Sequence, residues 1–202
     1  MSSTNRSDAR DKHIADYYVT PQKAIHNFLD VFLKDEWIDL STQEHMILDP
    51  CAWWKNWAED MSYPAVLFEY GADYNKIITN DIREDSPAKY HLDFLNKNNW
   101  NTYLYDMVIT NPPFNIAQDI IDRALEVCKQ WGYVIMLLRL NYFWGKVRQE
   151  FWKKHLPIRA YVHNRRMSFT PDWKTDSVEY MHCVWKKGEN PIETKLNLIY
   201  DF

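Results

Sequence analysis

One feature constrains this chain more than any other: a hydrophobic run that two consecutive prolines stop. Residues Tyr105 to Thr110 are followed at once by Asn111-Pro112-Pro113-Phe114. The run predicts a buried strand, and the prolines end it because they have no backbone N–H to donate. In open α/β sheets, ligands bind beyond the carboxyl ends of the strands. We therefore expect this turn to lie at a binding edge of such a sheet.

Strand and helix patterns alternate along the chain. Expected helices cover residues 20–34, 63–70, 116–130 and 142–155, and expected strands cover 46–49, 76–81, 105–110, 133–138, 158–163, 178–186 and 196–200. The first helix begins at Thr20-Pro21, a good start signal. Alternation of this kind predicts a mostly parallel sheet with helices on both faces, and the closely spaced last strands predict an antiparallel edge strand.

Length and composition are those of one intracellular α/β domain. The chain has 202 residues. We expect a flexible arm over residues 1–15 and a single domain over 16–202, because the first residues show no apolar periodicity. No stretch approaches the roughly 20 apolar residues of a membrane span, and the polar N-terminus is unlike a secretion signal, so a cytoplasmic location is expected. Three scattered cysteines predict reduced thiols and no metal site.

Charge and aromatic content favour a binding surface in the second half. The net charge is -4, yet bases crowd the segment from Lys146 to Arg166. A polyanion could bind there, or the bases could form a solvated face balanced by acids. Ten Trp residues accompany only four Gly. Some of these indoles must be partly exposed, and exposed aromatics suit base stacking or a protein interface.

The four residues of the turn suit methylation of an exocyclic amine. The lone pair of such an amine is delocalised into the base, so the reaction needs two acceptors that take both amine hydrogens. The Asn111 side-chain oxygen and the Pro112 carbonyl provide two acceptors. Pro112 also removes a competing backbone donor and stiffens the turn, Pro113 completes the motif, and Phe114 offers a face on which a flipped-out base can stack.

The segment Asp-Met-Val-Ile-Thr-Asn-Pro-Pro-Phe, residues 106–114, resembles the catalytic motif of amino-group DNA methyltransferases. The form with Phe is commonest among adenine-specific members, and the region from Phe169 to Lys187 is similar to small phage-encoded ones. The resemblance implies a class I S-adenosylmethionine-dependent, Rossmann-like fold and methylation of the N-6 amine of adenine in DNA. Related methyltransferases of protein glutamine and of RNA share the motif, and a plain turn after a strand is the alternative.

The same resemblance implies a set of residues that bind S-adenosylmethionine. One group belongs to an N-terminal motif, one to the first cofactor motif, one is an acid for the ribose hydroxyls, and one pair contacts the adenine. They are, in that order, Tyr18, Thr20 and Pro21; Asp49, Pro50 and Cys51; Asp81; and Asp93 with Phe94. Taken alone, a Thr-Pro helix start and an acid at a strand end are also ordinary helix caps.

The first cofactor motif departs from the family after Ala52. Trp53 and Trp54 stand where glycines are expected. Those glycines let the backbone pass close to the donor. Either the loop is routed so that the indoles point away, or the pocket is filled and the protein is an inactive descendant that binds DNA or a host protein.

Two later segments resemble the loops that flank the target base, because both mix bases with aromatics. The residues expected to contact nucleic acid are Arg139, Lys146, Arg165, Arg166 and Phe169. Surface loops with core-anchoring aromatics would look the same. We expect no separate target-recognition domain within residues 16–202, because the expected core motifs take up this length. His182, on an expected strand, is predicted to be packed rather than catalytic.

Overall fold

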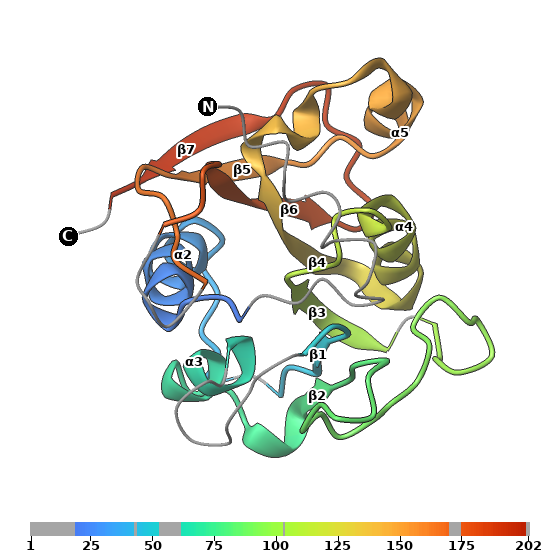
Figure 1. The fold of residues 1–202 in the computed structure, drawn as a ribbon. Helices are drawn as coiled ribbons and strands as arrows, with labels where there is room; N and C mark the ends of the chain where they lie inside the picture. The colour runs from blue at the N-terminus through green and yellow to red at the C-terminus, as the bar shows by residue number, and fades with distance from the viewer. Residues whose placement is uncertain (1–18, 43, 53–61, 103, 170–174, 201–202) are drawn as a thin grey trace.

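The computed structural model describes residues 19–42, 44–52, 62–102, 104–169 and 175–200 (Figure 1). Within them, seven strands form one sheet: β1 (Ile47–Asp49), β2 (Ile77–Thr79), β3 (Tyr105–Thr110), β4 (Cys128–Arg139), β5 (Arg159–His163), β6 (Tyr180–Lys186) and β7 (Lys195–Ile199). The expected arm over residues 1–15, Tyr18, Trp53 and Trp54 lie outside the described residues.

The sheet is mixed and mostly parallel, which confirms the predicted fold class. Its order is β2-β1-β3-β4-β6-β5-β7. Strands β2, β1, β3 and β4 are parallel neighbours, whereas β6 runs antiparallel to both β4 and β5. The antiparallel strand was expected at the edge, but it lies inside the sheet. The reason is that β5 pairs with the far side of β6, and β7 pairs in parallel with β5 and takes the outermost place.

Helices cover both faces of this sheet. They are α2 (Gln22–Asp35), α3 (Tyr63–Glu69), α4 (Ala117–Val127) and α5 (Gln149–Lys154), with short 3-10 turns η2 (Tyr74–Lys76), η3 (Leu140–Phe143) and η4 (Lys146–Arg148). Helices α2 and α3 lie on one face, and α4 and α5 lie on the other (Figure 1). Each face buries its own apolar cluster, one centred on Phe28 and Phe32 of α2, the other on Ile120 and Ile121 of α4.

The helix expected over residues 142–155 is wrong in its first half. The chain instead forms η3, turns at Gly145 and forms η4 before α5 begins. Gly145 has φ +114°, a conformation that a helix cannot contain and that side chains other than glycine rarely adopt. The aromatic segment from Leu140 to Arg148 therefore forms a compact loop after the carboxyl end of β4.

The helix expected to reach Gln130 ends earlier, at Val127. Strand β4 starts immediately afterwards and pairs with β3 in two registers, Tyr105 opposite Cys128 and Met107 opposite Tyr133. The residues in between bulge out of the ladder, and Trp131 takes a left-handed φ of 68° there. This bulge lengthens β4 beyond the predicted 133–138.

A buried arginine joins α4 to the loop beside it, and its removal tests how far that loop depends on it. Arg123 donates to the carbonyl of Trp100 at 2.8 Å and to the Glu126 carboxylate at 2.8 Å. We expect Arg123→Ala to lower the free energy of unfolding in urea by about 2 kcal/mol, because it leaves the buried carbonyl of Trp100 without this donor. The exposed pair Arg166–Glu179 is the matched control. Arg166→Ala should cost less than about 1 kcal/mol, and equal losses would contradict the prediction.

Candidate functional site

The carboxyl ends of the central parallel strands bring most of the expected site residues to one edge. Asp49 ends β1, Asp81 lies two residues beyond β2, Asn111 follows β3, and Arg139 ends β4. They share an edge because these four strands are parallel neighbours. The Asn111 turn therefore lies at the carboxyl edge of the parallel strands.

Asp49 is the buried centre of this edge. Its Oδ1 accepts a hydrogen bond from Thr110 Oγ1 at 2.6 Å and one from the backbone N–H of Cys51 at 3.3 Å. The pKa of Asp49 is raised to about 7. Burial is the main cause and the nearby charge of Asp81 adds to it, while the two hydrogen bonds oppose the rise. The carboxyl group thus changes charge near neutral pH. Burial also raises the pKa of the Cys51 thiol well above its usual value, so this thiol stays protonated.

Asn80 holds the loops of this edge together, and sequence reasoning missed it. Its fully buried amide donates to the carbonyls of Pro50 and Leu92 at 3.1 and 3.0 Å, and its oxygen accepts from the Leu92 N–H at 2.9 Å. One side chain thus ties the loop after β1 to the loop after β2. The only signal in the sequence was an amide next to Asp81 at the end of the predicted strand 76–81.

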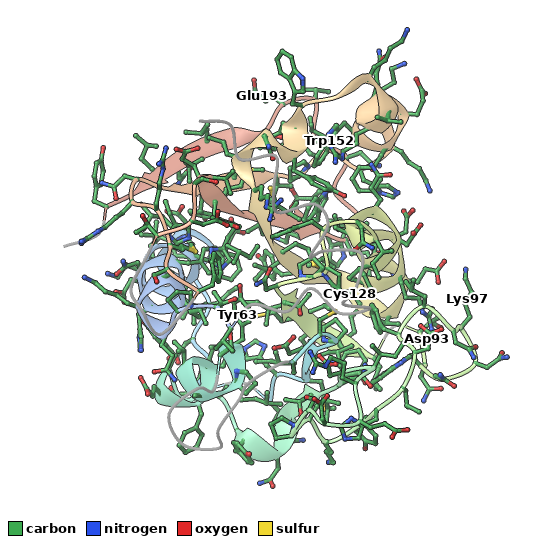
Figure 2. The ribbon with its side chains drawn as sticks, in the orientation of Figure 1. Tyr63, Asp93, Lys97, Cys128, Trp152 and Glu193 are labelled. Carbon is green, nitrogen blue, oxygen red and sulfur yellow. The ribbon has the colours of Figure 1, made fainter. Side chains whose placement is uncertain are left out.

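Asp81 and the Asp93-Phe94 pair lie on these tied loops. Asp81 accepts from the backbone N–H of Arg83 at 2.8 Å, and burial raises its pKa. Asp93 is exposed and accepts from the N–H of Leu95, so it caps its own turn on the α4 side of the sheet (Figure 2). The Phe94 ring is buried against Trp100, with ring centres 5.9 Å apart.

A buried polar chain runs beneath the expected N-terminal motif. The Tyr63 hydroxyl, at the start of α3, is 2.9 Å from His182 Nε2, and His182 Nδ1 is 2.8 Å from His163 Nε2 (Figure 2). Burial lowers the pKa of His182 well below its usual value. This confirms that His182 is packed. Thr20 is also buried, and its side chain lies beside the Tyr63 hydroxyl.

The Phe114 ring is held by side chains from two other strands. The Arg139 guanidinium, at the end of β4, lies 4.5 Å from the centre of this ring. The Tyr180 ring of β6 packs against it with the two ring centres 6.1 Å apart. Phe169 packs edge-on against the same Tyr180 at 4.9 Å. The structure thus gathers Phe114, Arg139 and Phe169 around Tyr180. Arg139 is half-buried, and its guanidinium contacts the Phe114 ring.

The remaining expected residues lie around this cluster. A pocket of about 350 Å³ is lined by Pro21 and Lys23 from the N-terminal segment and by His163, Arg165, Arg166 and Ser168 from the segment after β5. The N-terminal motif and the later basic segment therefore meet in space. Arg166 also pairs with Glu179 at 2.9 Å. Lys146 is exposed beside the turn at Gly145.

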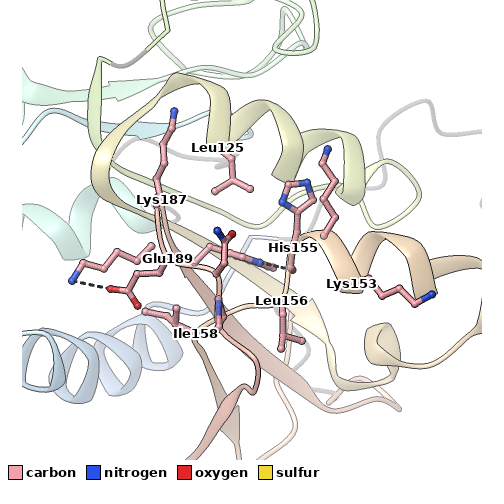
Figure 3. Close-up of a pocket in the computed structure, with 13 residues that line it drawn as sticks. Leu125, Lys153, His155, Leu156, Ile158, Lys187 and Glu189 are labelled. Atoms are coloured by element: carbon pink, nitrogen blue, oxygen red, sulfur yellow. Dashed lines mark hydrogen bonds and ion pairs between the residues drawn. The ribbon is translucent and has the colours of Figure 1, made fainter.

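A second pocket, drawn in Figure 3, lies at the opposite edge, where β4 begins and β6 ends. Its volume is about 320 Å³, and several lysines line it. Lys186 pairs with Glu189 at 3.5 Å, and Lys187 donates to the carbonyl of Cys128 at 2.8 Å. These charges hold the ends of the strands together, so we do not assign the site there.

Two further properties concern the described residues only. None of the described helices is long and apolar enough to cross a membrane. Among the same residues, no three His, Cys, Asp or Glu side chains gather as a metal ion would require.

Comparison with known proteins adds structural relatives only. No protein-family profile and no curated protein sequence matches the chain. A Listeria monocytogenes protein assigned to the class I S-adenosylmethionine-dependent methyltransferases superposes with a TM-score of 0.56 at 14% identity, over 95% of this chain and 69% of its own. The methyltransferase subunit of a type I restriction-modification system from Streptococcus thermophilus gives 0.61 at 11% identity, over 90% and 47%.

A Pyrococcus horikoshii protein assigned to the RNA methyltransferases gives a TM-score of 0.55 at 15% identity, over 87% of this chain and 90% of its own. The sheet order and these superpositions show that the chain has the class I S-adenosylmethionine-dependent methyltransferase fold. The chain spans about half the length of the restriction-modification subunit, with 47% of that protein covered.

The raised pKa of Asp49 predicts a pH-dependent stability. The folded state keeps a proton between the ordinary pKa near 3.8 and the raised value of about 7, so stability falls as pH rises through that window. Compared with Asp49→Asn, which cannot ionise, the wild type should lose on the order of 4 kcal/mol between pH 4 and pH 8. Urea denaturation of both proteins at both pH values measures this difference. A gap that stays constant with pH would contradict the raised pKa.

Proposed function

We propose that the protein transfers the methyl group of S-adenosylmethionine to the N-6 amine of adenine in DNA. One observation carries the proposal: the Asn111-Pro112-Pro113-Phe114 turn follows β3 directly, and β3 is tied to the buried acid of the first cofactor motif by the Thr110–Asp49 hydrogen bond. An amine-methylating turn and a candidate cofactor site thus share one edge of a methyltransferase fold.

The described residues fit the cofactor. Thr20 carries a buried hydroxyl just before the start of α2, and Asp49 and Asp81 are buried acids at neighbouring strand ends. Thr20 and Asp49 would hold the methionine end, and Asp81 would accept from the ribose hydroxyls. When bound, the cofactor supplies an electrophilic methyl group on a sulfonium.

The residues of the turn act on the base. The Asn111 side-chain oxygen and the Pro112 carbonyl accept the two amine hydrogens and so favour a tetrahedral, nucleophilic nitrogen. Phe114 carries the base on its ring, and the contacts from Arg139 and Tyr180 keep that ring in place. The support for DNA as the substrate is the motif itself, together with a restriction-modification methyltransferase subunit among the structural relatives.

Asn111→Ala tests the catalytic role. Removing one of two acceptors should lower methyl transfer to mixed-sequence DNA by a factor on the order of 10² to 10³, while the affinity for S-adenosylmethionine stays the same. Transfer of a labelled methyl group and calorimetric titration measure the two quantities. Asn115, exposed and four residues along, gives the matched control Asn115→Ala. If wild-type protein binds no S-adenosylmethionine, the chain is an inactive descendant and the proposal is wrong.

Cofactor affinity should rise with pH through neutrality. Asp49 must be ionised to attract the cationic groups of the cofactor, and its pKa of about 7 means that binding at lower pH has to displace a proton. We expect affinity to increase by up to about tenfold from pH 6 to pH 8. Titration calorimetry of wild type and Asp49→Asn checks this, because the variant should bind weakly and without this pH dependence.

A further inference from the structure

We infer that residues 140–154, here called the aromatic lobe, form a base-stacking platform for an unpaired stretch of nucleic acid beside the target base, with Trp144 at its centre. The inference rests on the proposed function, since it names the form in which the substrate is held. It concerns a residue outside the Asn111 turn and outside the cofactor site.

The lobe has two different faces. Phe151 and Trp152 pack inward against the apolar cluster around Ile120 and Ile121 of α4, and Figure 2 places Trp152 on the inner side of α5. Trp144 and Val147 point outward, and Trp144 is 83% exposed. A folded chain that leaves an indole in water forgoes about 2 kcal/mol of burial. An indole kept in this position is suited to a flat partner.

The backbone beneath Trp144 is fixed although its side chain is exposed. The Trp144 N–H donates to the carbonyl of Asn141 at 2.9 Å, and its own carbonyl accepts from Arg148 Nη1 at 2.8 Å. The Arg148 guanidinium in turn lies 4.2 Å from the centre of the buried Tyr142 ring. Because the loop backbone is already fixed, the exposed Trp144 side chain loses little further conformational freedom when it binds a partner.

Charge around the indole favours a polyanion over a protein. Residues 139–159 include six Lys or Arg and one carboxylate, in a chain whose net charge is -4. Phe143, Lys146, Trp152 and Lys153 line an open hollow next to Trp144. Lysine is depleted at the centres of protein interfaces. Aromatics interleaved with cations are the combination that binds single strands, the rings for bases and the cations for phosphates.

The lobe is continuous with the candidate active site. It begins directly after Arg139, whose guanidinium lies over the Phe114 ring. A strand with one base on Phe114 therefore has neighbouring nucleotides within reach of the lobe. Trp144 supplies a stacking surface for one of them, which offsets the stacking that the flipped base loses.

Equilibrium binding of a fluorescein-labelled, mixed-sequence single-stranded DNA of 12 nucleotides to the full chain tests this inference. Trp144→Ala should weaken binding about tenfold or more without changing its salt dependence, because it removes stacking and not charge. Lys146→Gln should reduce the salt slope by about 0.7, the value for one phosphate contact on a single strand. Trp37 is 93% exposed at the opposite edge, so Trp37→Ala is the matched control and should bind like wild type.

Two outcomes would overturn the inference. One is equal affinity of Trp144→Ala and wild type for the oligonucleotide. The other is weakened self-association of Trp144→Ala in sedimentation with unchanged oligonucleotide binding, which would make the lobe a protein interface. Neither outcome touches the methyl-transfer test on Asn111→Ala, so the platform and the proposed function fail separately.

Discussion

The hydrogen bond from Thr110 Oγ1 to the Asp49 carboxylate, 2.6 Å long, is the interaction on which the rest of the site depends. It joins the carboxyl ends of β1 and β3 where both are fully buried. An acid in that position would be costly without partners, and Thr110 with the Cys51 N–H provides them. Because Asn111 is the next residue after Thr110, the same bond sets the proposed catalytic turn beside Asp49 and Cys51.

Support for the site comes from the strand that runs against the others. Tyr180, at the start of antiparallel β6, contacts both Phe114 and Phe169. We assign it no part in the chemistry itself. Its hydroxyl is held by Asp176 at 2.6 Å. The reversed direction of β6 is what brings its first residue, and not its last, to the carboxyl edge of the parallel strands. At the other edge, Lys187 and Glu189 only tie the ends of strands together.

The local sequence pattern predicted the bounds of an element correctly where those bounds depend on neighbouring residues alone. The strand Tyr105–Thr110 was predicted to the residue, because a mostly apolar run is followed closely by two prolines that cannot continue a strand. The helix over 142–155 failed because periodicity does not report a left-handed backbone at Gly145. The end of α4 failed because the register between β3 and β4, a contact between distant segments, decided where helix became strand.

The sequence by itself determined the alternation of strands and helices, the turn at Asn111 and the buried character of His182, because each depends on residue types over a short span. Only the tertiary structure decided which groups meet. It tied Asn80 to two loops, placed Arg139 behind Phe114, and left Trp144 exposed beside the site. These outcomes depend on strand order and backbone direction, which bring together residues that lie far apart along the chain.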